Sequence, residues 1–114
     1  MDSSQILVDA QKCHEEGRFH AAANLLLAAF RADPENAHIA RQLGVVMRAV
    51  GDLNGAVDYL SRAFQSDPSD PDTISELILA LHELGRFEDA SAVLLNGLDA
   101  GVQVQVFASA LHAA

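Results

Sequence analysis

One stretch of this sequence occurs three times, at a spacing of 34 residues. Its best-preserved form is GDLNGAVDYLSRAFQSDP, at residues 51–68. A close relative, GRFHAAANLLLAAFRADP, covers residues 17–34, and a more divergent copy, GRFEDASAVLLNGLDAGV, covers residues 85–102. Three copies at one period are typical of a repeat protein, in which each unit buries its apolar face by stacking on its neighbours. The repeat therefore restricts the possible folds more than any other feature.

Each repeat predicts two helices separated by a glycine turn. Gly17, Gly51 and Gly85 end the first helix of each unit, because glycine adopts positive φ without strain. Pro34 and Pro68 follow the second helix, because proline cannot continue a helix. The predicted helices cover residues 3–16, 19–31, 37–50, 53–65, 71–84 and 87–98.

Two polar residues mark predicted helix starts, since their side chains can accept bonds from free backbone N–H groups. Asn36 precedes the third helix, and Asp70 precedes Pro71, a residue that suits the first helical position. Columns of equivalent apolar residues predict the core. A column of small residues, Ala22, Ala56 and Ala90, lets the two helices of each pair approach closely, and larger side chains fill the space between helix pairs. The inward positions include Cys13, Phe19, Ala22, Leu26, Gly44, Leu53, Ala56, Leu60, Phe87, Ala90 and Leu94.

These patterns predict an all-α fold, a right-handed α-solenoid of three antiparallel helix pairs plus a C-terminal helix. Residues 1–114 form one domain, with repeats at about 3–36, 37–70 and 71–102. Residues 103–114 are expected to be a capping helix or the start of a fourth repeat. The alternation from Val102 to Val106 also suits a strand, but a helix continues the architecture.

Composition excludes several classes of function. The chain has a formal charge of −9 with only seven Lys and Arg, so we expect no nucleic-acid or membrane partner. The single Cys13 excludes an intramolecular disulfide and fits a cytoplasmic protein. The five histidines lack the spacing of a metal site, and no motif places a nucleophile beside a base. We therefore expect no enzyme activity, cofactor or metal.

The spacing resembles the tetratricopeptide repeat, whose pattern is W-x2-L-G-x2-Y, then A-x3-F, then P. The second repeat carries it best, as Ala40-x2-Leu43-Gly44-x2-Met47, followed by Ala56-x3-Leu60 and Pro68. The resemblance covers about residues 3–102, and aliphatic side chains replace most of its aromatic positions. It implies a protein that holds a peptide or a partner domain in a concave groove lined by the first helix of each repeat.

Carried over by spacing, the resemblance assigns eleven residues to this groove. They are Leu7, Gln11, His14, His38, Arg41, Val45, Arg48, Asp72, Ser75, Leu79 and His82. Arg41 and Arg48 are its only basic residues, and a guanidinium can bind a carboxylate or a backbone carbonyl. The alternative is that they form ion pairs with nearby acids such as Glu76.

One binding mode of the family is predicted to be absent. Members that bind the tails of Hsp70 and Hsp90 hold a terminal carboxylate with Lys, Asn and Arg side chains. The corresponding residues here are Leu7, Gln11, Gln42, Ser75 and Leu79, so we reject that role.

Three hypotheses for function follow. The first is a protein-interaction scaffold that binds a partner peptide or domain in the groove. The second is that the chain is the N-terminal part of a larger protein, for example an enzyme such as a glycosyltransferase or sulfotransferase, with catalysis outside this chain. The third is a self-assembly module that forms homo-oligomers through residues 103–114.

Overall fold

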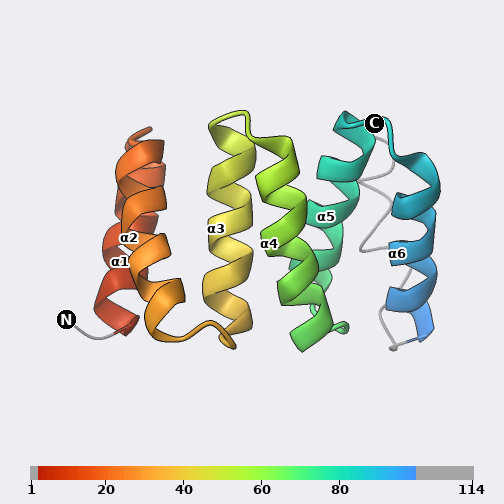
Figure 1. Ribbon diagram of the computed structural model, residues 1–114, viewed down its shortest axis with the longest axis horizontal. Coiled ribbons are helices and arrows are strands. Elements are labelled where there is room, and N and C mark those ends of the chain that lie inside the picture. The colour runs from red at the N-terminus through yellow and green to blue at the C-terminus, as the bar shows by residue number, and fades with distance from the viewer. Residues whose placement is uncertain (1–2, 100–114) are drawn as a thin grey trace.

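The computed structural model describes residues 3–99 and shows a row of six helices joined by short turns (Figure 1). Consecutive helices contact each other, and α3 also contacts α5. No strand occurs within residues 3–99. The helices are α1 (Ser3–Glu15), α2 (Phe19–Ala32), α3 (Ala37–Ala49), α4 (Leu53–Ser66), α5 (Pro71–Glu83) and α6 (Phe87–Asp99).

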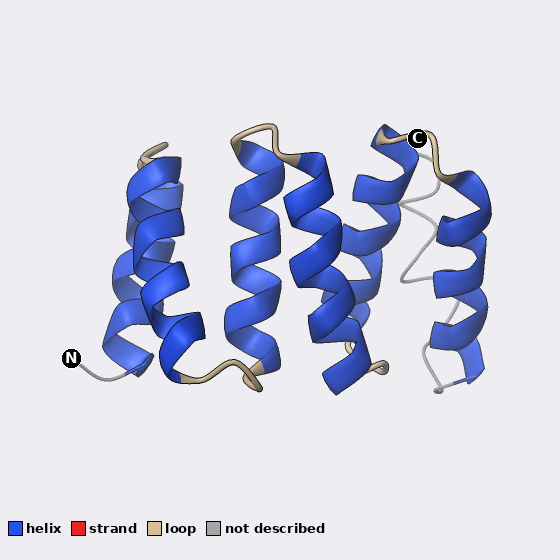
Figure 2. Ribbon diagram, in the orientation of Figure 1, coloured by secondary structure: helices blue, strands red, loops and turns tan. Residues whose placement is uncertain are grey.

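The all-α solenoid predicted from the sequence is confirmed, and each predicted helix end lies within one residue of the observed one. The turns after α1, α3 and α5 lie at one edge of the row, and those after α2 and α4 at the other (Figure 2). The predicted C-terminal helix, residues 103–114, lies outside the described residues.

Glycine makes the turn within each repeat, as predicted. Gly17, Gly51 and Gly85 have φ of 77°, 91° and 77°, values that favour glycine. At the first turn, the Gly17 N–H donates to the His14 carbonyl at 3.1 Å, and the Arg18 N–H donates to the Cys13 carbonyl at 2.8 Å. The same two bonds recur at Gly51 and Gly85. Carbonyl groups at the C-termini of α1, α3 and α5 therefore have hydrogen-bond partners of the same kind in all three repeats.

Side-chain caps fix where α3 and α5 begin, as predicted. Asn36 Oδ1 accepts from the backbone N–H groups of His38 and Ile39 at 3.0 and 3.3 Å. Asp70 Oδ1 accepts from the Asp72 N–H at 3.1 Å, and Pro71 occupies the first turn of α5. Each cap satisfies N–H groups that have no partner within the helix.

The core follows the predicted columns. Ala22, Ala56 and Ala90 are fully buried, and so are Leu26 and Leu60. These small and large residues alternate so that each helix of a pair approaches its partner closely. Cys13 is also buried, as the helical spacing predicts.

The prediction for Phe87 was wrong. Its side chain is 58% exposed, because α6 packs mainly against α5 among the described helices. Two buried residues of α3, Ile39 and Val46, were absent from the predicted core. Since α3 packs against both α2 and α4, its apolar stripe is wider than that of a helix with one neighbour.

Candidate functional site

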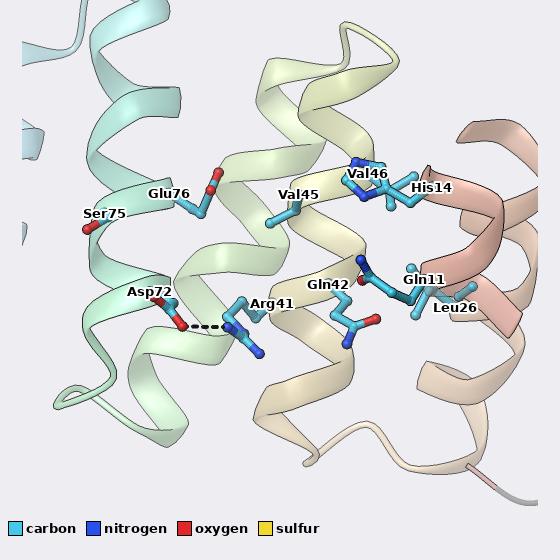
Figure 3. A pocket seen from close by; sticks show the side chains of 11 residues that line it. Gln11, His14, Leu26, Arg41, Gln42, Val45, Val46, Asp72, Ser75 and Glu76 are labelled. Atoms are coloured by element: carbon cyan, nitrogen blue, oxygen red, sulfur yellow. Dashed lines mark hydrogen bonds and ion pairs between the residues drawn. The ribbon is translucent and has the colours of Figure 1, made fainter. Parts of the chain in front are cut away.

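The first helices of the three repeats surround a cavity of about 320 Å³ (Figure 3). Helix α3 supplies its middle, with α1 on one side and α5 on the other. Its floor is apolar and its walls are polar. The lining residues are Ala10, Gln11, His14, Leu26, Arg41, Gln42, Val45, Val46, Asp72, Ser75 and Glu76.

Six of the eleven residues assigned to the groove from the sequence meet at this cavity. They are Gln11, His14, Arg41, Val45, Asp72 and Ser75. A seventh, Leu7, lines an adjoining hollow of about 620 Å³ together with Val8, Gln11, Lys12, Glu15 and Gln42. The remaining four, His38, Arg48, Leu79 and His82, line neither of these two hollows.

Two wall residues of the cavity, Gln42 and Glu76, are not among the eleven residues that the repeat spacing assigns to the groove. Both line the main cavity, and Gln42 also lines the adjoining hollow. Gln42 and Glu76 occupy equivalent positions of the second and third repeats, and the equivalent residue of the first repeat is Val8. Including the column of Val8 beside that of Leu7 would have found them, because equivalent residues of stacked repeats lie side by side.

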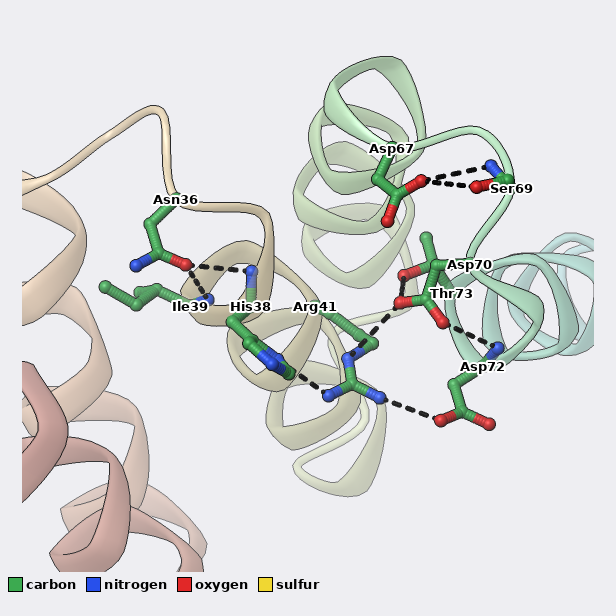
Figure 4. A network of polar contacts seen from close by, with 9 residues as sticks. All are labelled: Asn36, His38, Ile39, Arg41, Asp67, Ser69, Asp70, Asp72 and Thr73. Atoms are coloured by element: carbon green, nitrogen blue, oxygen red, sulfur yellow. Dashed lines mark hydrogen bonds and ion pairs between the residues drawn. The ribbon is translucent and has the colours of Figure 1, made fainter.

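Arg41 lies at the centre of a polar network between α3 and α5 (Figure 4). Its Nη1 donates to Asp72 Oδ2 at 3.1 Å, and its Nε lies 3.8 Å from Asp70 Oδ2. On its own helix, Nη2 is 2.9 Å from His38 Nδ1. A residue assigned to the groove, His38, therefore contacts Arg41 rather than the cavity.

Arg48 forms a second link between the same helices. Its Nη1 donates to Glu83 Oε1 at 2.8 Å, and its Nη2 lies 3.2 Å from Glu76 Oε2. The alternative of ion pairs with nearby acids is thus confirmed for both arginines, including the pair with Glu76. The two side chains connect the second repeat to the third.

Two histidines assigned to the groove contact aromatic rings. The His14 ring centroid lies 5.4 Å from that of Phe19, and the His82 centroid lies 5.1 Å from that of Phe87. These equivalent pairs, two repeats apart, orient both imidazoles against the start of the second helix. Within residues 3–99, no group of three potential metal ligands occurs.

The two leucines assigned to the groove are half-buried and belong partly to the core. Leu7 packs against the cluster around Ala10 and Leu26, and Leu79 against the cluster around Leu77 and Ile78. Val45 alone of the three predicted apolar groove residues faces the main cavity. None of the helices in the described part of the chain is long and apolar enough to cross a membrane.

Comparisons with known proteins agree with this arrangement. A family model described as "Tetratricopeptide repeat" matches residues 47–113, which is more than half of the chain. A search of curated protein sequences finds no match.

Solved structures similar to this chain include three repeat proteins. The Sgt2 TPR domain from Aspergillus fumigatus has a TM-score of 0.83 at 17% identity, covering 97% of this chain and 78% of that one. The second TPR of Spaghetti (RPAP3), bound to the HSP90 peptide SRMEEVD, has a TM-score of 0.79 at 16% identity, covering 86% and 91%. MamA (AMB-1) has a TM-score of 0.74 at 22% identity, covering 89% of this chain. This chain covers 56% of that MamA chain, so it spans about half its length.

Proposed function

This chain belongs to the tetratricopeptide repeat family, and from that premise we propose that it is a protein-interaction scaffold. Its binding surface is the groove between α1, α3 and α5, and the ligand is a segment of a partner protein. The observation that carries the proposal is the cavity of about 320 Å³ to which the first helix of every repeat contributes side chains.

The chemistry of the lining suits a polypeptide ligand. Gln11 and Gln42 line both hollows, and each carboxamide can donate to a carbonyl and accept from an N–H group. Val45 adds apolar surface for a side chain. A surface with a few polar groups around an apolar floor can both bind and orient a ligand.

A terminal carboxylate is not the ligand that we propose. The residues at the clamp positions are Leu7, Gln11, Gln42, Ser75 and Leu79, which provide no cation. The likeness to the peptide-bound Spaghetti domain is one of fold, at 16% identity. The hypothesis that Arg41 and Arg48 anchor a carboxylate or carbonyl stays a prediction, and such a ligand would have to compete with their ion pairs to α5.

The proposal gives this chain a binding role without catalysis and places it in the cytoplasm, where a reduced Cys13 is expected. We propose a protein partner rather than nucleic acid, since the charge of −9 opposes a polyanion. An enzyme domain elsewhere in a longer protein stays the second hypothesis.

Site-specific photocrosslinking tests the groove directly. A photoreactive amino acid at Ser75, which lines the cavity, should crosslink a partner protein in cells that express the chain. The matched control carries the same group at Asp58, an exposed residue of α4 that lines neither hollow. The proposal predicts a product specific to the Ser75 variant, identified by mass spectrometry. Identical products from both variants, or none from Ser75, would contradict it.

A further inference from the structure

The charged groups beside the groove are unequal in number. Arg41 and Arg48 are the basic residues that link α3 to α5, and each of them pairs with two carboxylates. Four carboxylates therefore surround two guanidinium groups, which leaves an excess of two negative charges. The acids are Asp70, Asp72, Glu76 and Glu83.

Exposure strengthens this imbalance. The side chains of Arg41 and Arg48 are 19% and 29% exposed, whereas those of Asp72 and Glu83 are 74% and 42% exposed. The Nε atoms of both arginines are buried. A group that approaches Arg41 from solvent therefore meets the Asp72 carboxylate before it meets the guanidinium, and Coulomb attraction favours a cation there.

The opposite end of the groove is mainly apolar, with one lining residue of each charge. Val8 on α1 is 64% exposed and lines the adjoining hollow with Leu7, Lys12 and Glu15. Gln11 and Gln42 line both hollows and so join the apolar end to the acidic end. The groove thus presents three kinds of surface in order: aliphatic on α1, carboxamide between α1 and α3, and carboxylate on α5.

We infer that the partner segment is extended and basic at one end, with a Lys or Arg beside Asp72 and an aliphatic side chain against Leu7 and Val8. The inference rests on the proposed function and specifies its ligand. Packed helices lie about 8–10 Å apart, so α1 and α5 are separated by about 20 Å. An extended chain rises about 3.3 Å per residue, so about six residues separate the basic and the aliphatic side chains.

Selection from a phage-displayed library of random dodecapeptides tests this inference with a defined probe. The full chain should select peptides that carry Lys or Arg about six residues from Leu, Ile or Val. Synthetic versions should bind more weakly as NaCl is raised from 50 to 300 mM, because salt screens exposed charges.

Variants locate the binding. The change Asp72→Asn should weaken a selected peptide about 2- to 5-fold, the usual effect of one exposed charge pair. The control Asp58→Asn, which removes an exposed carboxylate of α4, should leave affinity unchanged. Val8→Ser should weaken the peptide without loss of helicity by circular dichroism, because Val8 is mostly exposed. Asp72→Lys should shift selection toward Asp and Glu.

The outcomes separate the two proposals. If the selected peptides are acidic or neutral and still block crosslinking from the Ser75 position, the inference of a basic ligand is wrong. The groove would then remain the proposed binding site. Peptides whose affinity is insensitive to every groove variant would overturn the groove itself and the inference with it. Failure to select any peptide would count against both.

Discussion

Gly44 shows how closely the two helices of the middle repeat approach each other. A Cβ atom at this position would lie 2.5 Å from Leu60 Cγ and 3.2 Å from the Ala56 carbonyl oxygen. Both neighbours are fully buried, and side chains in a close-packed interior cannot move far without cost. The absence of a side chain at Gly44 therefore sets the distance between α3 and α4.

Gly44→Ala should destabilise the protein although alanine favours helices. The gain in helix propensity is about 1 kcal/mol, and overpacking a core typically costs about 1–3 kcal/mol. Because the contact with Leu60 is far inside van der Waals range, we expect a net loss of about 1–2 kcal/mol, measured by urea denaturation.

A double-mutant cycle checks the cause. Gly44→Ala should cost less in a Leu60→Ala background, where the overlapping atoms are gone, although that background is itself less stable. Equal costs in the two backgrounds would show that the Leu60 contact is not responsible.

Asp70 carries three interactions at the start of α5. It accepts from the Asp72 N–H and from the Thr73 hydroxyl at 2.9 Å, and it faces Arg41 Nε. Asp70→Ala should lower the free energy of unfolding by about 1–2 kcal/mol, the usual cost of a lost N-cap. Asp70→Asn should recover most of this loss, because Asn also caps. If Asn is as harmful as Ala, the charge rather than the cap is the stabilising feature.

At the scale of helices, the two junctions between first helices differ. Arg41 and Arg48 link α3 to α5 through four carboxylates, whereas the residues of α1 that line the main cavity are Ala10, Gln11 and His14. The equivalent residues of α1 are Leu7 and His14, neither of which is a lysine or an arginine. The arginine ion pairs that join the second and third repeats therefore have no sequence counterpart in the first repeat.

Arg48→Ala should destabilise the protein by about 1–2 kcal/mol. It removes the partner of Glu76, whose Oε2 is buried, and partial solvent screening keeps the effect below that of a fully buried pair. The matched control is Arg86→Ala, which breaks an exposed pair with Asp89 and should cost at most about 0.5 kcal/mol. Chemical denaturation of both variants decides the point, and equal small losses would contradict the proposed link.

The helices were predictable from the sequence because glycine and proline punctuate them at fixed intervals. The residues of the groove were predictable only in part. Repeat spacing shows which face of a helix a residue occupies, but it does not show the direction in which a long side chain extends. Arg48 was placed in the groove, yet it reaches sideways to Glu83, 35 residues away. The exposure of Phe87 depends on which helices cover α6, a property of the whole stack rather than of the local pattern.

At the scale of the whole molecule, α6 presents two exposed large apolar residues, Phe87 and Leu95. The predicted self-association through residues 103–114 concerns a segment outside the described residues. It is tested by light scattering on the 114-residue chain and on a chain that ends at residue 102. We expect the mass of the 114-residue chain to rise with concentration and the chain that ends at residue 102 to stay a monomer. If both chains are monomers at every concentration, the prediction is wrong.

The turns between repeats have a consequence for engineering. Asp33 and Asp67 end their helices with nearly equal φ, −145° and −144°, and the caps Asn36 and Asp70 also match, at −78° and −75°. Both turns use the same pair of backbone hydrogen bonds. A duplicate of residues 35–68 inserted after Pro68 would therefore meet native junctions at both ends. It would lengthen the solenoid and its groove by one repeat, so the number of repeats would determine the length of the peptide that the groove can hold.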